Sequence, residues 1–343
     1  MVNSKYLLFL IALCSCSPYR YISIETYNPA EINFPVEMRR ILVVNNALPQ
    51  DDVPFESSLR RIPESDIIVT DSVAFDFCRT LAETLSDFQP FDDVRLLEGC
   101  YRKDFSPLSA PIMKREDVEL LSDEHEADIV ISLDRLLFRL NEHAESILGI
   151  QTQHVIYIEI SGVLRLYMPG REAPMAAILL TDTVISDLGY DYDDKDLLDL
   201  LFSADQTNLL RASARYLAYK ARTHFIPYWS EDDRWYYVSF ESRWKEAAAY
   251  AESEKWDKAL DIWKALYEGA KSWKQRARLC SNIALGLEMT GDLAGALEYA
   301  KLSHQLMLDH LGADDTLTKN QENYITVLTG RLTEEPKLRL QIN

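Results

Sequence analysis

The pattern of apolar residues between positions 39 and 100 alternates between strand and helix. The β-branched run at 39–47 is typical of a buried strand, and residues 93–98 predict a second, shorter strand. Between them, a helix over 71–86 is predicted by apolar residues that recur every four positions: Val73, Phe77, Leu81 and Leu85.

The pattern then changes from helix to long strands. A charged amphipathic helix is expected over 114–126, followed by a buried strand over 127–133 that extends toward residue 140. A long alternating strand is expected over 152–168 and another strand over 174–188, and with Pro169-Gly170 as the turn between them they predict an antiparallel hairpin. A long helix is expected over 194–225. The order β-α-β-α-β-β-β-α therefore predicts an α/β fold with a mixed sheet.

The last third of the chain contains an internal repeat. A shift of 37 residues places Ala247 on Ala284 and Ala259 on Ala296, and it places Trp263 on Ala300. Gly291-Asp292 in the second copy has the small residue that a tight turn between two helices needs, whereas Glu254-Lys255 occupies that place in the first copy.

This repeat resembles the tetratricopeptide repeat, in which small residues let paired helices pack closely. The resemblance implies an all-α domain over 241–332 that ends in a capping helix at 316–332. It also implies that a concave face with Asn282 and Glu288 is exposed and polar. The expected packing residues are Ala247, Ala259, Trp263, Ala284, Gly291, Ala296 and Ala300.

A short apolar run from Tyr6 to Leu13 opens the chain. It is far shorter than the roughly 20 residues of a membrane-spanning helix. Leu13-Cys14-Ser15-Cys16 follows and resembles the lipobox of bacterial lipoproteins, which implies cleavage after Ser15 and lipidation of Cys16. An ordinary secretory signal and a short membrane anchor are the alternatives.

These patterns predict six segments. Residues 1–15 are expected to be a signal peptide, 16–38 a tether, 39–228 the α/β domain and 229–240 an aromatic junction. The helical repeats occupy 241–332, and a tail follows over 333–343.

Composition narrows the classes of partner. The formal net charge of −19 repels nucleic-acid phosphates, so no nucleic-acid partner is expected. The cysteines and histidines lack the spacing of a zinc site, and neither a metal nor another cofactor is predicted beyond the lipid on Cys16. Cys78 and Cys280 are typical of buried thiols, and a bond between Cys78 and Cys100 stays open.

Aromatic residues beside carboxylates form the one candidate ligand platform. Trp229, Trp235 and Tyr237 flank the acidic segment 230–234 and are able in principle to stack on sugar rings. The alternative is that these rings are buried where two domains join. The acidic segment 191–196 departs from a calcium loop at two positions and is better explained as a helix start. The sequence contains no motif of a known catalytic site, so we expect no catalytic residue and no enzymatic activity.

As a whole, the chain is similar to a family of tetratricopeptide-containing lipoproteins from Bacteroidetes, and its α/β part is similar to periplasmic assembly lipoproteins such as the curli secretion channel. The resemblance implies a lipid-anchored protein of the cell envelope, most simply on the periplasmic face of the outer membrane, with surface exposure as the alternative. Three hypotheses follow: a non-catalytic scaffold that binds a protein partner, a carbohydrate-binding or carbohydrate-processing lipoprotein, and a structural subunit of an envelope assembly.

Overall fold

The computed structural model describes residues 18–35, 37–50, 53–57, 71–88, 91–102, 106–147, 151–190 and 206–342. These residues form two compact units. The sheet unit spans Ala30–Ile226. The ribbon–helix unit combines the residues up to Pro29 with those from Pro227 onward. The predicted signal peptide at 1–15, with its predicted cleavage site at Ser15, and the predicted lipidation site Cys16 lie outside the described residues, as does the acidic segment 191–196.

The sheet unit is built on a mixed sheet with the strand order β4-β2-β5-β6-β7, and a short β3 also pairs with β5. β2 is parallel to both β4 and β5, whereas β5, β6 and β7 run antiparallel to one another. The strands are β2 (Arg40–Asn45), β3 (Phe55–Ser57), β4 (Asp93–Cys100), β5 (Ile129–Ile147), β6 (Gln151–Tyr167) and β7 (Ala176–Tyr190).

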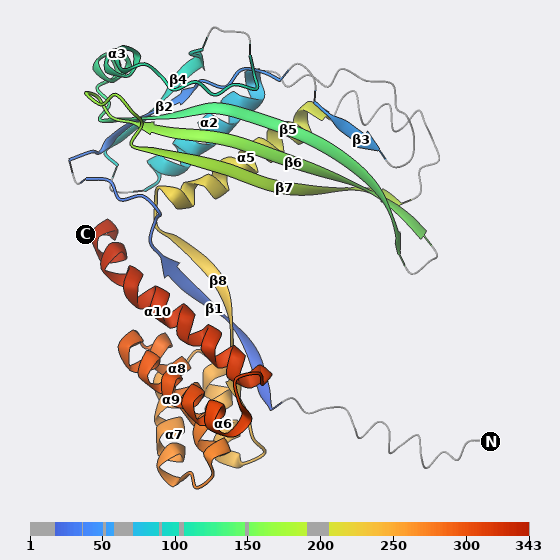
Figure 1. Ribbon diagram of the computed structural model, residues 1–343, viewed down its shortest axis with the longest axis vertical. Helices are drawn as coiled ribbons and strands as arrows, with labels where there is room; N and C mark the ends of the chain where they lie inside the picture. The colour runs from blue at the N-terminus through green and yellow to red at the C-terminus, as the bar shows by residue number, and fades with distance from the viewer. Residues whose placement is uncertain are drawn as a thin grey trace. The chain divides into compact units, whose positions relative to one another are not determined.

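Helices cover both faces of this sheet. α2 (Asp71–Ser86) and α5 (Gln206–Ala221) lie along one face in Figure 1, and η1 (Arg222–His224) follows α5. Their core includes Phe77, Leu81 and the even-numbered residues of β6, such as Ile158. α3 (Arg115–His125) packs on the opposite face against Leu42 and Val130. The predicted α/β class and element order are therefore confirmed, with β3 as an addition.

Two strands distant in the sequence form a separate antiparallel ribbon. β1 (Tyr19–Asn28) pairs along its whole length with β8 (Tyr228–Tyr237), from Tyr19↔Tyr237 to Asn28↔Tyr228. The two strands run side by side in Figure 1. This corrects the expectation of an irregular tether at 16–38, because β1 lies inside that segment. It also shows that most of the aromatic junction at 229–240 is a strand.

Five helices complete the ribbon–helix unit within the described residues: α6 (Ser242–Glu252), α7 (Trp256–Gly269), α8 (Trp273–Met289), α9 (Leu293–Leu311) and α10 (Thr316–Ile342). Each packs on the next along the chain. Small residues permit this close packing. A Cβ placed on Gly286 of α8 would lie 3.0 Å from the Leu260 side chain of α7. The all-helical carboxy-terminal part predicted from the sequence is thus present.

The two turns inside the helix pairs occupy equivalent positions of the repeat. Gly291 connects α8 to α9 with a φ of +88°, and Glu254, 37 residues earlier, connects α6 to α7 with a φ of +58°. Glycine adopts this left-handed conformation at little cost, whereas a residue with a Cβ is strained there. Asp292 then caps α9 by accepting a hydrogen bond from the Gly295 amide at 2.9 Å.

None of the helices in the described part of the chain combines the length and the apolar character that crossing a bilayer requires.

Candidate binding site on the ribbon–helix unit

The β1–β8 ribbon lies against the first helix of each successive pair. Its contacts come from Glu252 of α6, Asn282 and Glu288 of α8, and Tyr324 of α10. These three helices form a groove, which we call the ribbon groove, and the ribbon of the same chain fills it.

Asn282 holds the ribbon through its backbone. Its side-chain Oδ1 accepts a hydrogen bond from the Tyr237 amide at 2.7 Å, and its Nδ2 donates one to the Tyr237 carbonyl at 2.8 Å. Asn282 is fully buried, and Tyr237 is 1 % exposed. The side-chain amide of Asn282 and the backbone amide and carbonyl of Tyr237 therefore have hydrogen-bond partners without water, as buried polar groups require.

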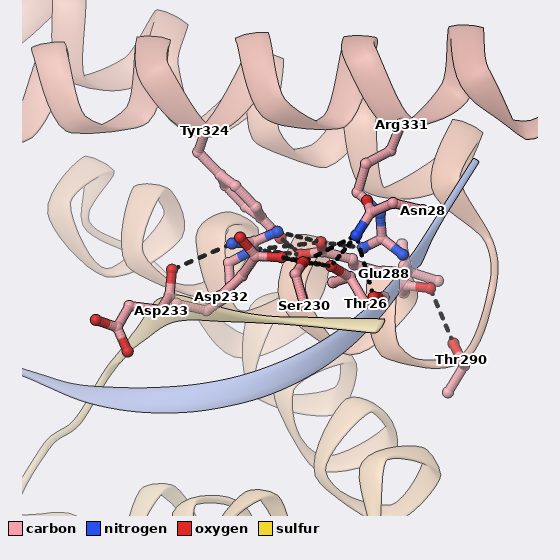
Figure 2. A network of polar contacts seen from close by, with 11 residues as sticks. Thr26, Asn28, Ser230, Asp232, Asp233, Glu288, Thr290, Tyr324 and Arg331 are labelled. Atoms are coloured by element: carbon pink, nitrogen blue, oxygen red, sulfur yellow. Dashed lines mark hydrogen bonds and ion pairs between the residues drawn. The ribbon is translucent and has the colours of Figure 1, made fainter. Parts of the chain in front are cut away.

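Glu288 forms the centre of a buried charge network, drawn in Figure 2. Its carboxylate accepts hydrogen bonds from Arg234 Nη2 at 3.0 Å and from the Tyr324 hydroxyl at 2.7 Å, and Arg331 pairs with the same carboxylate. Tyr324 and Arg331 both descend from α10 toward Glu288. The Glu288 side chain has no exposed surface, so two guanidinium groups neutralise a charge that water cannot reach.

A second group of polar side chains continues this network along the ribbon. Asp232 accepts hydrogen bonds from Thr26 and from Ser230, and Asn28 donates to the Ser230 hydroxyl at 2.8 Å. These side chains come alternately from β1 and β8, on the face that points toward the helices (Figure 2). The inner face of the ribbon is therefore held by polar contacts over part of its length.

Burial and charge displace several pKa values in this unit. Burial raises the pKa of the Tyr324 hydroxyl well above its usual range, and the neighbouring Glu288 carboxylate adds to the effect. Burial works to lower the pKa of Arg234, but its bond to Glu288 and the negative charge there outweigh burial and raise the pKa. Tyr324 thus stays a hydroxyl donor and Arg234 stays a cation.

The opposite side of the ribbon, which we call the outer ribbon face, carries Tyr21, Ser23, Glu25, Tyr27, Trp229, Glu231 and Asp233, and the half-buried Trp235 lies opposite Tyr21 on the same side. Tyr21 is 67 % exposed and Trp229 is 63 % exposed, which is unusual for such large rings. Trp229 packs on Tyr27 with 4.8 Å between the ring centres. Glu25 lies directly opposite Glu231 in the strand register.

A cleft of about 310 Å³ lies at the Asn28–Tyr228 end of the ribbon. Trp229 and Tyr27 line it from the ribbon, and the other lining residues come from both strands and the neighbouring helices: Glu25, Asn28, Pro29, Glu288, Met289, Gly291, Leu293, Arg331, Glu334, Glu335 and Leu338. The cleft combines aromatic and aliphatic surface with several carboxylates.

The structure separates the three residues of the predicted ligand platform. Trp229 is exposed and lines the cleft, whereas Trp235 is half-buried with its ring 5.6 Å from that of Tyr324. Tyr237 is buried in the ribbon groove. Only Trp229 of the three is therefore presented to a ligand.

The expectation of an exposed concave face at Asn282 and Glu288 is wrong. Both are buried, at 0 % and 3 % exposure, because the ribbon covers them. The residues expected to pack the repeats are buried apart from Gly291, which forms a turn: Ala247, Ala259, Trp263, Ala284, Ala296 and Ala300.

Sequence reasoning missed the partners of Glu288 and Asn282. Arg234 and Arg331 lie 54 and 43 positions from Glu288, so no local spacing connects them. The available signal was the alternation of Ile22, Ile24 and Thr26, which identifies β1 as a strand with one buried face.

Among the residues of the sheet unit that the structure describes, the buried carboxylates have complete sets of partners. Asp134 accepts hydrogen bonds from Asn46, Ser132, Arg165 and Tyr167. Asp76 is bonded by Arg79 and Arg211, each at 2.6 Å. Such fully paired groups stabilise the fold and leave no oxygen free for a ligand.

The thiols and potential metal ligands are dispersed. Cys78, Cys100 and Cys280 form no disulfide within the described part of the chain. Burial raises the pKa of Cys280 to about 11, so that this thiol stays protonated. Within the described ranges, no three histidine, cysteine or acidic side chains gather in a way that would hold a metal ion.

Solved structures with some likeness to the chain have low identity to it. A neuraminyllactose-binding hemagglutinin homolog from Helicobacter pylori is 12% identical, with 56% of this chain and 94% of that chain covered and a TM-score of 0.26. A minor lipoprotein from Acinetobacter baumannii is 8% identical, with 53% and 93% covered and a TM-score of 0.21. A hypothetical protein from Chlamydia trachomatis is 12% identical, with 55% and 97% covered and a TM-score of 0.26. TM-scores this low carry no argument about function.

No curated protein matches the chain. Two family models do. Residues 245–330 match a Domain of unknown function (DUF6340), and residues 38–237 match another (DUF8603). Since the second match covers 200 of the 343 residues, the chain belongs to the DUF8603 family.

Proposed function

We propose that this protein is a non-catalytic lipoprotein of a bacterial cell envelope, anchored through Cys16, that binds another protein through the outer ribbon face. The helix pairs α6–α7 and α8–α9 act in this proposal as tetratricopeptide-like repeats that hold the ribbon in place. A Bacteroidetes origin and a position on the periplasmic side of the outer membrane belong to the same proposal.

Support for the anchor comes from the sequence. Leu13-Cys14-Ser15-Cys16 directly follows an apolar run too short to span a bilayer. A mature lipoprotein amino terminus carries three acyl chains, and two or more lipid signals are sufficient for stable attachment.

One observation supports protein binding above all: two large aromatic side chains, Tyr21 and Trp229, are exposed on a ribbon whose other face is firmly packed. Tryptophan and tyrosine are enriched among the residues that dominate protein–protein affinity. Because Asn282 and Glu288 fix the ribbon from behind, the two rings are presented on a rigid surface, and little side-chain and backbone freedom is lost when a partner binds.

The ribbon groove itself is not the partner site in this proposal. Tyr236 and Tyr237 already fill it, each 1 % exposed. A partner strand entering the groove would have to displace the ribbon and break the Glu288 network. The outer ribbon face is available without such a rearrangement.

Photo-crosslinking in the producing cells tests the proposal. A benzophenone amino acid at Tyr21 or at Trp229 is expected to crosslink the full-length chain to a protein. The matched control is Leu302 of α9, which is 50 % exposed and distant in sequence from the ribbon. Equal crosslinking from all three positions, or none from Tyr21 and Trp229, contradicts the proposal.

The anchor is tested separately by Cys16→Ser. The variant is expected to lose incorporation of radiolabelled palmitate and to leave the membrane fraction. A variant that still sediments with membranes would show that another segment attaches the protein.

Carbohydrate binding is a second candidate, which the exposed Trp229 favours. Aromatic rings beside carboxylates stack on sugars and accept bonds from their hydroxyl groups. Glycan-array binding of the full-length chain that is lost on Trp229→Ala would support it. The third hypothesis, a structural subunit, requires ring-shaped oligomers, which light scattering would detect.

A further inference from the structure

Two acidic side chains face each other on the outer ribbon face at a cost in stability. Glu25 and Glu231 are exact cross-strand partners, and both are exposed. Like charges directly opposite in an antiparallel pair destabilise it. Neither residue forms an ion pair in the part of the chain that the structure describes. The repulsion is therefore not relieved from within that part of the molecule.

The next pair along the same face is aromatic. Tyr27 lies opposite Trp229, and the packing of Trp229 on Tyr27 fixes the indole while leaving 63 % of the residue exposed. The face of an indole ring attracts cations, and tryptophan does so more strongly than the other aromatic residues. The acidic pair and the aromatic pair are thus adjacent on one surface.

The cleft beside these pairs is predominantly negative. Its charged lining consists of four glutamates, Glu25, Glu288, Glu334 and Glu335, and one arginine, Arg331. Arg331 is already engaged by the buried Glu288, and Arg339 engages Glu335. Glu25 and Glu334 remain to attract a positive charge.

The size and the apolar lining limit what the cleft accepts. A volume of about 310 Å³ is at the lower end for ligand pockets, so a single long side chain fits better than a folded element. Met289, Leu293 and Leu338 supply aliphatic surface. A long aliphatic stem with a cationic end matches both properties, because such a side chain buries its stem and keeps its charge near carboxylates.

We infer that the cleft between Trp229 and α10, together with the Glu25–Glu231 pair, binds a lysine or arginine side chain of a partner protein. The stem lies along Leu293 and Leu338, and the cation lies between the Trp229 ring and the two ribbon carboxylates. This assignment rests on the proposed protein-binding function and names the chemistry that the partner must provide.

Fluorine NMR on the full-length lipoprotein in nanodiscs tests the inference. The chain is labelled with 5-fluorotryptophan, and the Trp229 resonance is assigned with Trp229→Phe. The probes are a pentapeptide with two lysines between glycines, the same peptide with glutamines in their place, and chitotetraose. The lysine peptide is expected to shift the Trp229 resonance saturably, and the glutamine peptide is not. The resonance of Trp273, which stacks on His310, serves as the internal reference.

Variants separate binding from folding. Trp229→Ala is expected to weaken lysine-peptide binding by about 2- to 30-fold, the range of a cation–π contact. Binding to this variant is measured from the fluorine resonances of the other five tryptophans. Glu231→Gln is expected to weaken binding while raising the unfolding temperature, because it removes the repulsion with Glu25. Glu298→Gln, at an exposed position of α9, is the matched control and changes neither quantity.

Three results would overturn the inference: equal shifts with the lysine and glutamine peptides, a shift with chitotetraose alone, or a lower unfolding temperature in Glu231→Gln. These outcomes leave the proposed function intact if Tyr21 and Trp229 still crosslink to a protein, since the partner would then use other chemistry. Loss of crosslinking with retained lysine binding would contradict the proposed function instead.

Discussion

The side-chain amide of Asn282 makes both of the hydrogen bonds that a neighbouring strand would make to Tyr237. α8 therefore recognises β8 through its backbone, independent of the side chain at position 237. Together with the charge network around Glu288, this contact fixes a two-stranded ribbon that would be marginally stable alone in water.

Asn282→Asp is expected to destabilise the ribbon–helix unit by roughly 1–3 kcal/mol, the cost of a buried polar group that loses its partner. Aspartate keeps the shape of the side chain, but the Tyr237 carbonyl loses its donor. Urea unfolding followed by circular dichroism measures the change, and faster hydrogen exchange at the Tyr237 amide locates it. Asn323→Asp, at an exposed position of α10, is the control and should be close to neutral.

Glu288→Gln is expected to cost about 3–5 kcal/mol, because it leaves the buried Arg234 guanidinium without its countercharge. Arg331 is partly exposed and able to turn to water, whereas Arg234 is not. The measurement is the free energy of unfolding from urea titration. An equal effect of Glu322→Gln, at an exposed position of α10, would show that burial of the charge is not the cause.

Glu254→Gly is expected to raise stability by up to about 1 kcal/mol, since it removes a Cβ from a residue with a φ of +58°. The gain in the free energy of unfolding is smaller than the backbone strain that is removed, because glycine also increases the conformational entropy of the unfolded chain. Gly291→Ala, at the equivalent turn with a φ of +88°, should lower stability. Differential scanning calorimetry of both variants tests the pair, and a change of the same sign in both would contradict the explanation.

Asp128 makes the sheet unit sensitive to acid. Its bond from the Arg40 guanidinium, helped by the Arg39 and Arg40 amides, holds the pKa of this carboxyl below its usual range. A depressed pKa stabilises the fold above the ordinary pKa of about 4, and the contribution is lost as the pH falls below that value through the folded pKa. In Asp128→Asn, the unfolding temperature should be lower at pH 6 and should fall less steeply than in the wild type as the pH drops below 4.

Sequence patterns predict the helices and strands correctly where the contacts are local or where one periodic pattern continues over many residues. The helix at 71–86 matches α2 because four apolar residues mark one face. The hairpin at 152–188 matches β6 and β7 because the first long strand alternates and Pro169-Gly170 marks the turn. The resemblance to a helical repeat likewise anticipated the helices that follow residue 241.

The ribbon and its groove could not be predicted in the same way. The partner of β1 lies at least 200 residues away, and Pro18 and Pro29 flank the strand, so the local sequence favours an irregular segment there. Asn282 and Glu288 occupy positions of α8 that look solvent-facing when the helix is considered alone. Only the distant Tyr237 and Arg234 convert them into buried residues.

The discontinuity of the ribbon–helix unit imposes an order on biosynthesis. Tyr19 leaves the ribosome early, but its strand partner Tyr237 is made 218 residues later, after the whole sheet unit. Pairing at such a separation is slow, because a long intervening chain must first be brought back on itself. A product truncated before residue 228 would carry β1 without β8, and with it neither Trp229 nor the Tyr27–Trp229 pair. The surface that we propose for recognition therefore exists only on chains whose translation has passed that point.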